Sequence, residues 1–160
     1  RYFTHSTEFI IWARKNSKTP HFYNYALMKA LNAGKQMTDV WQIPAIGKWE
    51  KSCGKHPTQK PLAVLARLIQ ASTEPNAWIL DPFSGSATTG IAANLLGRRY
   101  LGLEKEESFL SMSKARREEL ENITIRQSYI ERLQKGNHIL SSNALSLAEE
   151  PESDYSAPWF

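Results

Sequence analysis

A run of apolar residues that ends at an acid and continues into small residues is the clearest candidate ligand-binding motif of this sequence. Residues 78–90 read WILDPFSGSATTG, so the apolar run stops at Asp81 and Gly85 follows among serines. Glycine and small neighbours let a ligand approach the backbone, and free N–H groups at the start of a following helix favour a carboxylate or another anion. These residues predict a turn that binds a ligand against its main chain.

A second acid, Glu104, ends the next apolar run, RRYLGLE, which spans residues 98–104. In a doubly wound sheet, ligands bind outside the carboxyl ends of the strands, and an acid about twenty residues after the glycine turn accepts hydrogen bonds from ribose hydroxyls. The turn and the acid together indicate an adenosine-containing cofactor. The alternative is a tight structural turn followed by an unrelated surface glutamate.

Two common nucleotide-binding loops do not fit this turn. A phosphate-binding P-loop ends in Gly-Lys-Ser/Thr, whereas the turn continues as Ala87, Thr88 and Thr89. The dinucleotide signature GxGxxG is not met either, because the turn contains only Gly85 and Gly90. A mononucleoside cofactor is therefore favoured over NAD or FAD.

The residues around the two acids predict the elements that position them. Residues 77–81 and 98–104 read as short buried strands, and helical patterns follow them at 88–97 and 106–123. A further helix precedes them, with Pro61 in its first turn and apolar residues along one face. This alternation of helices and strands predicts an α/β fold with a parallel sheet and crossover helices.

The remaining segments carry weaker patterns. Residues 7–13, TEFIIWA, predict a short buried strand. The long irregular segment after it contains one helical pattern near 24–33, which Gly34 would end. Toward the C-terminus, residues 125–135 are compatible with a helix and 137–140 with a short strand.

Positive charge is concentrated in the first part of the chain. The net charge is +4, but residues 1–60 hold ten Lys/Arg against three Asp/Glu, whereas residues 61–160 hold ten against thirteen. The basic part also contains several aromatic residues, and this combination suits a polyanion such as nucleic acid. A solvated basic surface is the alternative interpretation. The candidate phosphate contacts are Lys15, Lys18, Lys29 and Lys35.

Length and composition narrow the remaining classes. The 160 residues are 41% hydrophobic, which suits one ordered domain rather than a disordered chain. No apolar run approaches the ~20 residues of a membrane span, and the polar N-terminus does not resemble a signal peptide. The single cysteine, Cys53, cannot form an internal disulfide or a zinc site alone, so we expect a reducing cytoplasm and no bound metal.

Three motifs resemble those of the DNA amino-methyltransferases. DPFSGSATTG is similar to their cofactor-binding motif I, GKHPTQKP at residues 54–61 to their motif X, and YLGLE at 100–104 to the acid-bearing strand after motif I. Motif X before motif I, with basic recognition residues before both, is the order of the β group. The resemblance covers roughly residues 1–120. Within the group it is strongest to the second adenine-N6 methyltransferases of DpnII-type restriction-modification systems, whose site is GATC.

The resemblance implies a Rossmann-like S-adenosylmethionine-dependent methyltransferase fold, with part of the parallel-sheet core and a basic recognition segment. It implies transfer of a methyl group from S-adenosylmethionine to the N6 atom of an adenine flipped out of DNA. It assigns residues 1–55 to the end of the catalytic strand region and target recognition, 56–124 to the cofactor-binding portion, and 125–160 to a C-terminal tail. Cytosine-N4 methylation and a non-catalytic module that binds the cofactor or DNA are the alternatives.

The matching motifs also imply residue roles. Thr58, Gln59 and Lys60 would meet the methionine end of the cofactor, and Glu104 its ribose. His56 is interpreted as a structural residue rather than a base. The motif I residues that would line the cofactor are Asp81, Phe83, Ser84, Gly85, Ser86, Thr88 and Thr89.

One residue departs from motif I. Ala87 stands where the motif usually has glycine, so it adds a methyl group and disfavours a positive φ. If the backbone there is helical, we expect this alanine to reduce cofactor affinity at most.

The catalytic motif of the family, Asp/Asn/Ser-Pro-Pro-Tyr/Phe/Trp, is the larger departure. No Pro-Pro pair occurs in the chain, and the look-alike SAPWF at 156–160 does not follow an apolar strand. In the family this motif orients a poorly nucleophilic amine and stacks on the flipped base. We therefore expect the carboxyl-terminal part of a methyltransferase, with no catalytic residue of its own. Alone, it would transfer little or no methyl. Besides DNA, a complementing N-terminal segment or a second copy in a homodimer is a possible partner.

Overall fold

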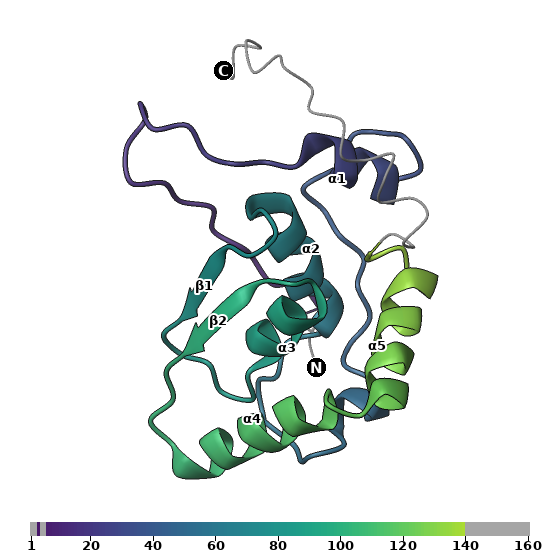
Figure 1. The fold of residues 1–160 in the computed structure, drawn as a ribbon. Helices are drawn as coiled ribbons and strands as arrows, with labels where there is room; N and C mark the ends of the chain where they lie inside the picture. The colour runs from purple at the N-terminus through teal and green to yellow at the C-terminus, as the bar shows by residue number, and fades with distance from the viewer. Residues whose placement is uncertain (1–2, 4–5, 140–160) are drawn as a thin grey trace.

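The computed structural model describes residues 3 and 6–139 (Figure 1). Among these residues, none of the helices combines the length and the apolar character needed to cross a bilayer. The look-alike at 156–160 lies outside the described residues. The elements, in chain order, are α1 (Tyr25–Leu31), the 3-10 helix η1 (Lys48–Lys51), α2 (Leu62–Ser72), β1 (Trp78–Asp81), α3 (Thr88–Leu95), β2 (Arg99–Gly102), α4 (Glu107–Glu119) and α5 (Ile123–Lys135).

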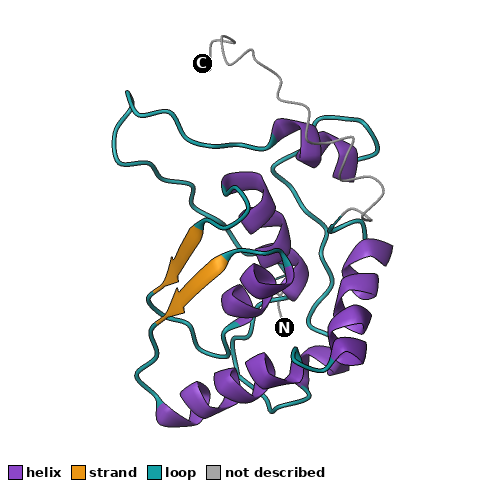
Figure 2. Cartoon of the chain, in the orientation of Figure 1, coloured by secondary structure: helices purple, strands orange, loops and turns teal. Residues whose placement is uncertain are grey.

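Strands β1 and β2 pair in parallel, as the sequence predicts, with Trp78 opposite Arg99 and Asp81 opposite Gly102. Helix α3 connects them as the crossover that a parallel pair requires. Helices α2 and α3 lie on one side of the strands (Figure 2). Because both strands run the same way, their carboxyl ends meet at one edge. The sequence predicts Asp81 and Glu104 at this edge.

The main core lies between the sheet and the helices. Apolar residues of α2, including Leu62 and Ile69, pack against Ile91 and its alanine neighbours in α3, while the inward side chains of the strands pack on this cluster. Helix α5 contributes Tyr129 and Leu133, both buried. The sequence left the packing of this segment open, and the described part of it belongs to the core.

A smaller apolar cluster attaches α1 to the end of α2. Leu27, Met28 and Leu31 pack with Ala71, and the backbone N–H of Asn24 donates to the carbonyl of Ala71 at 2.9 Å. The side chain of Asn24 caps α1 by accepting from the N–H of Leu27. This cluster is one contact between the N-terminal part of the chain and the α/β core; a second is the buried Glu50 of η1, which accepts from the N–H of Leu62 at 2.8 Å.

The prediction of a buried strand at residues 7–13 is wrong. The segment has no strand pairing, and Phe9 and Ile11 are 95% and 89% exposed. Apolar content alone does not make a strand, because the backbone also needs a hydrogen-bonding neighbour, and in the described residues β1 pairs only with β2.

Other boundaries differ from the predicted ones for local reasons. The expected helix at 106–123 ends at Glu119, because Asn122 caps a second helix by accepting from the N–H groups of Thr124 and Ile125. Pro61 is the N-cap of α2 rather than part of its first turn. Residues 137–139 do not form the predicted strand, and residue 140 is not described.

The two strands are buried on one face only, so the prediction of buried strands holds for alternate residues. Ile79 and Tyr100 pack on the core, whereas Trp78 and Leu80 are 67% and 63% exposed and Leu101 is also exposed. Figure 2 shows no helix over the outer face of the strands within the described chain.

The backbone at Ala87 is not helical, so the condition under which this alanine was expected to have little effect is not met. Ala87 is the N-cap of α3, with φ 54° and ψ 36°, which is the left-handed region. Its carbonyl accepts from the N–H of Ile91, and its own N–H donates to the carbonyl of Ser84. The turn therefore keeps a glycine-like conformation although an alanine occupies the position.

Replacing Ala87 by glycine should stabilise the protein. The left-handed conformation costs an alanine about 1–2 kcal/mol, and the greater freedom of glycine in the unfolded chain offsets part of that gain. We expect Ala87→Gly to raise the free energy of unfolding, measured by denaturant titration, by about 0.5–1 kcal/mol. Ala92→Gly, inside α3, is the control and should lower it by about 1 kcal/mol or more. A destabilised Ala87→Gly variant would contradict this account.

Candidate functional site

The turn after β1 and the segment after β2 are joined by the carboxylate of Glu104. Its Oε2 atom accepts from the N–H of Gly85 at 2.7 Å, and its Oε1 atom accepts from the N–H of Glu106 at 2.9 Å. The N–H of Ser84 adds a third link by donating to the carbonyl of Leu103 at 2.9 Å. Each carboxylate oxygen has two acceptor positions, so Glu104 retains capacity for further donors.

These backbone donors favour the ionised form of Glu104. The N–H of Glu106 has the largest effect and lowers the pKa of the Glu104 carboxyl. Partial desolvation opposes it, while the N–H of Gly85 and the nearby His56 lower the pKa further. The net effect lowers the pKa below its usual value, so the carboxylate is ionised at neutral pH.

A pocket of about 580 Å³ opens beside this hydrogen-bonded turn. Its lining combines aromatic rings, one carboxylate and the backbone of Gly85. Phe83 is 89% exposed on its rim. The lining residues are His56, Pro82, Phe83, Gly85, Leu103, Glu104, Lys105 and Phe109.

Gly85 is placed where a side chain would not fit. Its φ is +51°, and a Cβ atom there would lie 2.9 Å from Nε2 of His56. The imidazole of His56 also packs on the ring of Phe109, with 4.2 Å between the ring centroids. The histidine therefore forms a wall of the pocket against the exposed backbone of the turn.

The structure brings some of the sequence-predicted residues to the pocket and places others elsewhere. Phe83, Gly85 and Glu104 line it, and Asp81 shapes the turn by accepting from the N–H of Phe83 at 3.1 Å. Ser84 is half-buried in the turn, and Thr89 is half-buried in α3.

The three predicted residues of GKHPTQKP lie outside the lining. Gln59 is buried and donates to the carbonyl of Glu50 at 2.7 Å, while its Oε1 atom is buried without a partner among the described residues. Lys60 pairs with Glu8 at 2.7 Å on the surface, and Thr58 is exposed.

Arg116 of α4 is hydrogen-bonded to the turn from the interior of the protein. It is 2% exposed and donates to the carbonyl of Ser86 and, at 3.1 Å, to the hydroxyl of Thr88. Burial lowers the pKa of its guanidinium. Both of its acceptors belong to the predicted motif, and both residues are themselves buried. Ser86 and Thr88 are therefore inner supports of the turn.

Sequence reasoning missed Phe109, Lys105 and Arg116. The first two follow Glu104 closely in the chain, so their place just after the second acid-terminated run could have indicated them. Arg116 gave no such signal, because in the sequence it looks like one of several basic residues in an exposed helix.

Comparisons with known proteins agree on one family. Residues 1–115 match the family model N6_N4_Mtase, described as DNA methylase. The chain is 61% identical over 120 residues to the type II methyltransferase M2.MboI of Moraxella bovis, and 57% identical over 119 residues to the type II methyltransferase M2.DpnII of Streptococcus pneumoniae. These matches cover 75% and 74% of this chain but 44% of each relative.

A solved structure is also similar in sequence. The crystal structure of the M1.HpyAVI–SAM complex is 38% identical, with 51% of this chain and 38% of that chain covered and a TM-score of 0.43. The chain thus spans less than half the length of the curated relatives and of the solved structure that it matches.

Adding a methyl group at Gly85 should cost more than the backbone strain alone. Gly97 is the matched control, because its φ is +70° and a Cβ atom there would have no neighbour within 4 Å. We expect Gly85→Ala to lower the free energy of unfolding by about 1–3 kcal/mol more than Gly97→Ala does, because only the former crowds His56. Combining Gly85→Ala with His56→Ala should recover part of this difference. Equal losses in the two single variants would show that the contact with His56 is loose.

The hydrogen bonds to Glu104 predict a pH dependence of stability. Because folding lowers the pKa of this carboxyl, its contribution is complete above the ordinary value of 4.5 and is lost as the pH falls through the lower folded value. Glu104→Gln should therefore be less stable than the wild type at pH 7, and the gap should close under acid. Denaturant titrations from pH 7 to pH 2.5 measure it. Glu118→Gln, on an exposed carboxylate of α4, should show no comparable gap, and a pH-independent gap for Glu104→Gln would contradict the assignment.

Proposed function

Because the chain belongs to the DNA methylase family, whose model matches residues 1–115, we propose that it contributes the S-adenosylmethionine site of a DNA adenine-N6 methyltransferase. The observation that carries the proposal is the pocket beside the Gly85 turn, where the ionised carboxylate of Glu104 follows the second strand. Bound there, S-adenosylmethionine would supply an electrophilic methyl group on a sulfonium sulfur.

The chemistry of the pocket fits such a nucleoside. Glu104 keeps free acceptor positions for ribose hydroxyls, and its negative charge favours a cationic sulfonium. The rings of Phe83, Phe109 and His56 offer apolar and aromatic surface to a purine. Gly85 leaves the space that a Cβ atom would fill.

The methionine end is assigned to Thr58, Gln59 and Lys60 as part of this proposal. The exposed ion pair of Lys60 with Glu8 holds the ammonium group only weakly, since such pairs contribute about 0–1 kcal/mol. The Oε1 atom of Gln59 has no partner among the described residues, but it is buried, so its contact with an ammonium group would require the GKHPTQKP segment to shift. Asp81, Ser84, Ser86, Thr88 and Thr89 act through the shape of the turn.

The basic segment is proposed to contact DNA, with GATC as the target sequence suggested by the relatives named above. Lys15, Lys18, Lys29 and Lys35 are all exposed, as phosphate contacts require. We assign residues 1–55 to target recognition and 56–124 to cofactor binding, and we propose a cytoplasmic location. The free thiol of Cys53 suits that reducing environment.

Methyl transfer requires a Pro-Pro-Tyr-like motif that these 160 residues do not contain. We propose that a complementing polypeptide provides it and covers the outer face of β1 and β2. That face exposes Trp78, Leu80, Leu101 and Leu103, although parallel sheets are normally buried on both faces. A second copy of this chain is the alternative cover, but it would bring no such motif.

Calorimetric titration with S-adenosylhomocysteine tests the cofactor assignment. We expect saturable binding, weakened about 10- to 100-fold by Glu104→Ala, because the ligand would lose its hydrogen bonds to a charged acceptor. Glu118→Ala is the control and should bind like the wild type. Absence of binding heat from a folded wild-type chain would contradict the proposal.

The transfer reaction is tested with the same preparation. Alone, the chain should not methylate GATC-containing DNA, and addition of the complementing segment should yield N6-methyladenine. If N4-methylcytosine is the product, the adenine assignment is wrong while the cofactor site stands.

A further inference from the structure

We propose that Glu50 is a positioning residue for the cofactor site, because its buried carboxylate fixes the segment GKHPTQKP against the rest of the chain. This inference rests on the proposed function, since it concerns the residues assigned to the methionine end of the cofactor. Glu50 belongs to the 3-10 helix η1 and is 4% exposed. A buried carboxylate is costly unless it is hydrogen-bonded, so its partners indicate what it holds in place.

The carboxylate of Glu50 joins the loop before η1 to the start of α2. Its Oε2 atom accepts from the N–H of Leu62 at 2.8 Å, and its Oε1 atom accepts from the N–H of Gly47 at 3.2 Å. Leu62 is the first residue of α2, where the N–H groups have no acceptor within the helix. A negative charge is also favourable at this end of a helix. Glu50 therefore fixes the residue that directly follows GKHPTQKP.

A second hydrogen bond holds the segment itself. The side chain of Gln59 donates to the backbone carbonyl of Glu50 at 2.7 Å, and Gln59 is buried. Its neighbours Thr58 and Lys60 are exposed, where a ligand can reach them. The contacts of Glu50 with Gln59 and Leu62 thus lie on either side of Lys60 in the sequence, and together they determine where the exposed residues stand.

Helix η1 is itself attached to the helices that follow the sheet. The hydroxyl of Tyr129 in α5 donates to the carbonyl of Trp49 at 3.2 Å, and the two rings meet edge-on with 4.9 Å between centroids. The hydroxyl of Ser52 donates to the carboxylate of Glu119 in α4 at 2.8 Å. Glu50 therefore holds GKHPTQKP from a base that α4 and α5 keep in place.

The charge of Glu50 also acts on the residue that supports the turn after β1. Burial lowers the pKa of the Arg116 guanidinium, and Glu50 is among the nearby groups that oppose this effect. Arg116 donates to the carbonyl of Ser86 and to the hydroxyl of Thr88 in that turn. Glu50 thereby stands between two parts of the proposed cofactor site, the segment assigned to the methionine end and the turn assigned to the nucleoside.

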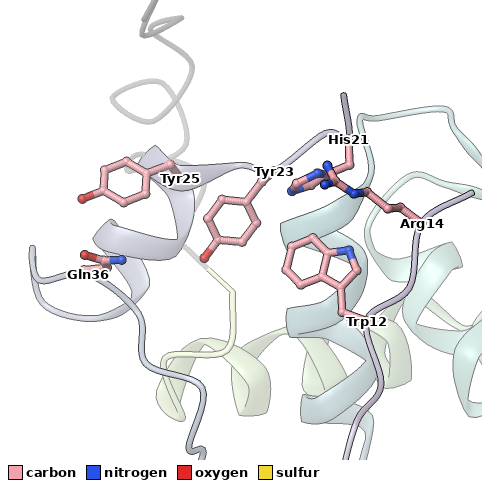
Figure 3. A pocket seen from close by; sticks show the side chains of 6 residues that line it. All are labelled: Trp12, Arg14, His21, Tyr23, Tyr25 and Gln36. Atoms are coloured by element: carbon pink, nitrogen blue, oxygen red, sulfur yellow. The ribbon is translucent and has the colours of Figure 1, made fainter. Parts of the chain in front are cut away.

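A recess formed by the first part of the chain has no residue in common with this link. It has a volume of about 380 Å³ and is lined by Trp12, Arg14, His21, Tyr23, Tyr25 and Gln36 (Figure 3). Trp12 is 60% exposed. A substitution of Trp12 therefore perturbs the first part of the chain without removing a bond of Glu50.

The test compares two ligands that share the adenosine and the sulfur but differ at the amino-acid end. S-adenosylhomocysteine carries this end, and methylthioadenosine lacks it. Both are titrated calorimetrically into the folded chain, and the readout is the ratio of the two affinities. We expect the wild type to bind S-adenosylhomocysteine at least about tenfold more tightly, because only this ligand has the carboxylate and ammonium groups that Thr58 and Lys60 would meet.

Glu50→Gln keeps the size of the side chain but replaces one acceptor oxygen by a donor nitrogen, so one of the two N–H groups loses its partner. We expect this variant to lower the affinity ratio by about 5- to 20-fold, because the segment that meets the amino-acid end is no longer fixed. The affinity for methylthioadenosine should change by less than about twofold. A general loss of structure would weaken the binding of both ligands alike.

Two control variants should leave the affinity ratio unchanged. Gln70→Ala removes another buried polar side chain of α2, which donates to the carbonyls of Ala66 and His138 near the other end of the helix. Trp12→Leu alters the recess of Figure 3. The unfolding midpoints of all variants show whether the fold is kept.

Tyr129→Phe is a milder second variant for the case in which Glu50→Gln does not fold. It removes only the hydroxyl that holds the carbonyl of Trp49, the residue before Glu50. The affinity ratio should therefore fall in the same direction but less, by about two- to fivefold.

The outcomes separate this inference from the proposed function. If Glu50→Gln lowers both affinities equally or lowers neither, Glu50 does not position the segment, and an unchanged ratio in Tyr129→Phe overturns the inference as well. If the wild type binds the two ligands equally, the assignment of the methionine end fails together with the inference, while the adenosine site at Glu104 stands. If the folded wild type binds neither ligand, the proposed cofactor site itself is wrong.

Discussion

The carboxylate of Glu104 is the group on which the candidate site depends. It binds the N–H of Gly85 and the N–H of Glu106 at once, so one side chain fixes the turn after β1 against the segment after β2. The parallel pairing of the strands makes this contact possible, because it brings two carboxyl ends together that are separated by a whole helix in sequence. Without the carboxylate, the backbone bonds that Leu103 makes with Ser84 and Asp81 would remain between the two segments, but the N–H of Gly85 would lose its acceptor.

Two residues that support the turn, Ala87 and Arg116, each carry an energetic cost. Ala87 adopts a left-handed conformation, and Arg116 is buried with part of its guanidinium unpartnered in the described structure. Both features are unfavourable by themselves. Both hold the residues between Gly85 and Thr88 in one shape. We interpret this combination as stability given up for a fixed backbone surface, which is typical of ligand-binding turns.

Much of this arrangement could be predicted from the sequence, because it depends on local patterns. The apolar runs that end in Asp81 and Glu104 predicted the strands, their direction and the edge at which the acids lie. The runs could not show which face of each strand is covered, since that depends on distant segments. For the same reason the apolar residues 7–13 looked like a strand although no neighbour pairs with them. The sequence did not indicate the left-handed backbone of Ala87 or the burial of Arg116, because alanine disfavours a positive φ and arginine is mostly exposed.

The two strands leave hydrogen-bonding groups unpaired at the edges of the described sheet. In the described residues β1 and β2 form a sheet of only two strands, so each strand has one edge with unpaired N–H and C=O groups. Beside these edges lie the exposed side chains of Trp78, Leu80 and Leu101. Unprotected edges next to an apolar face are templates for strand addition between identical chains. A further strand that pairs with either edge would satisfy its unpaired N–H and C=O groups, so the described pair of strands is built to be extended on both sides.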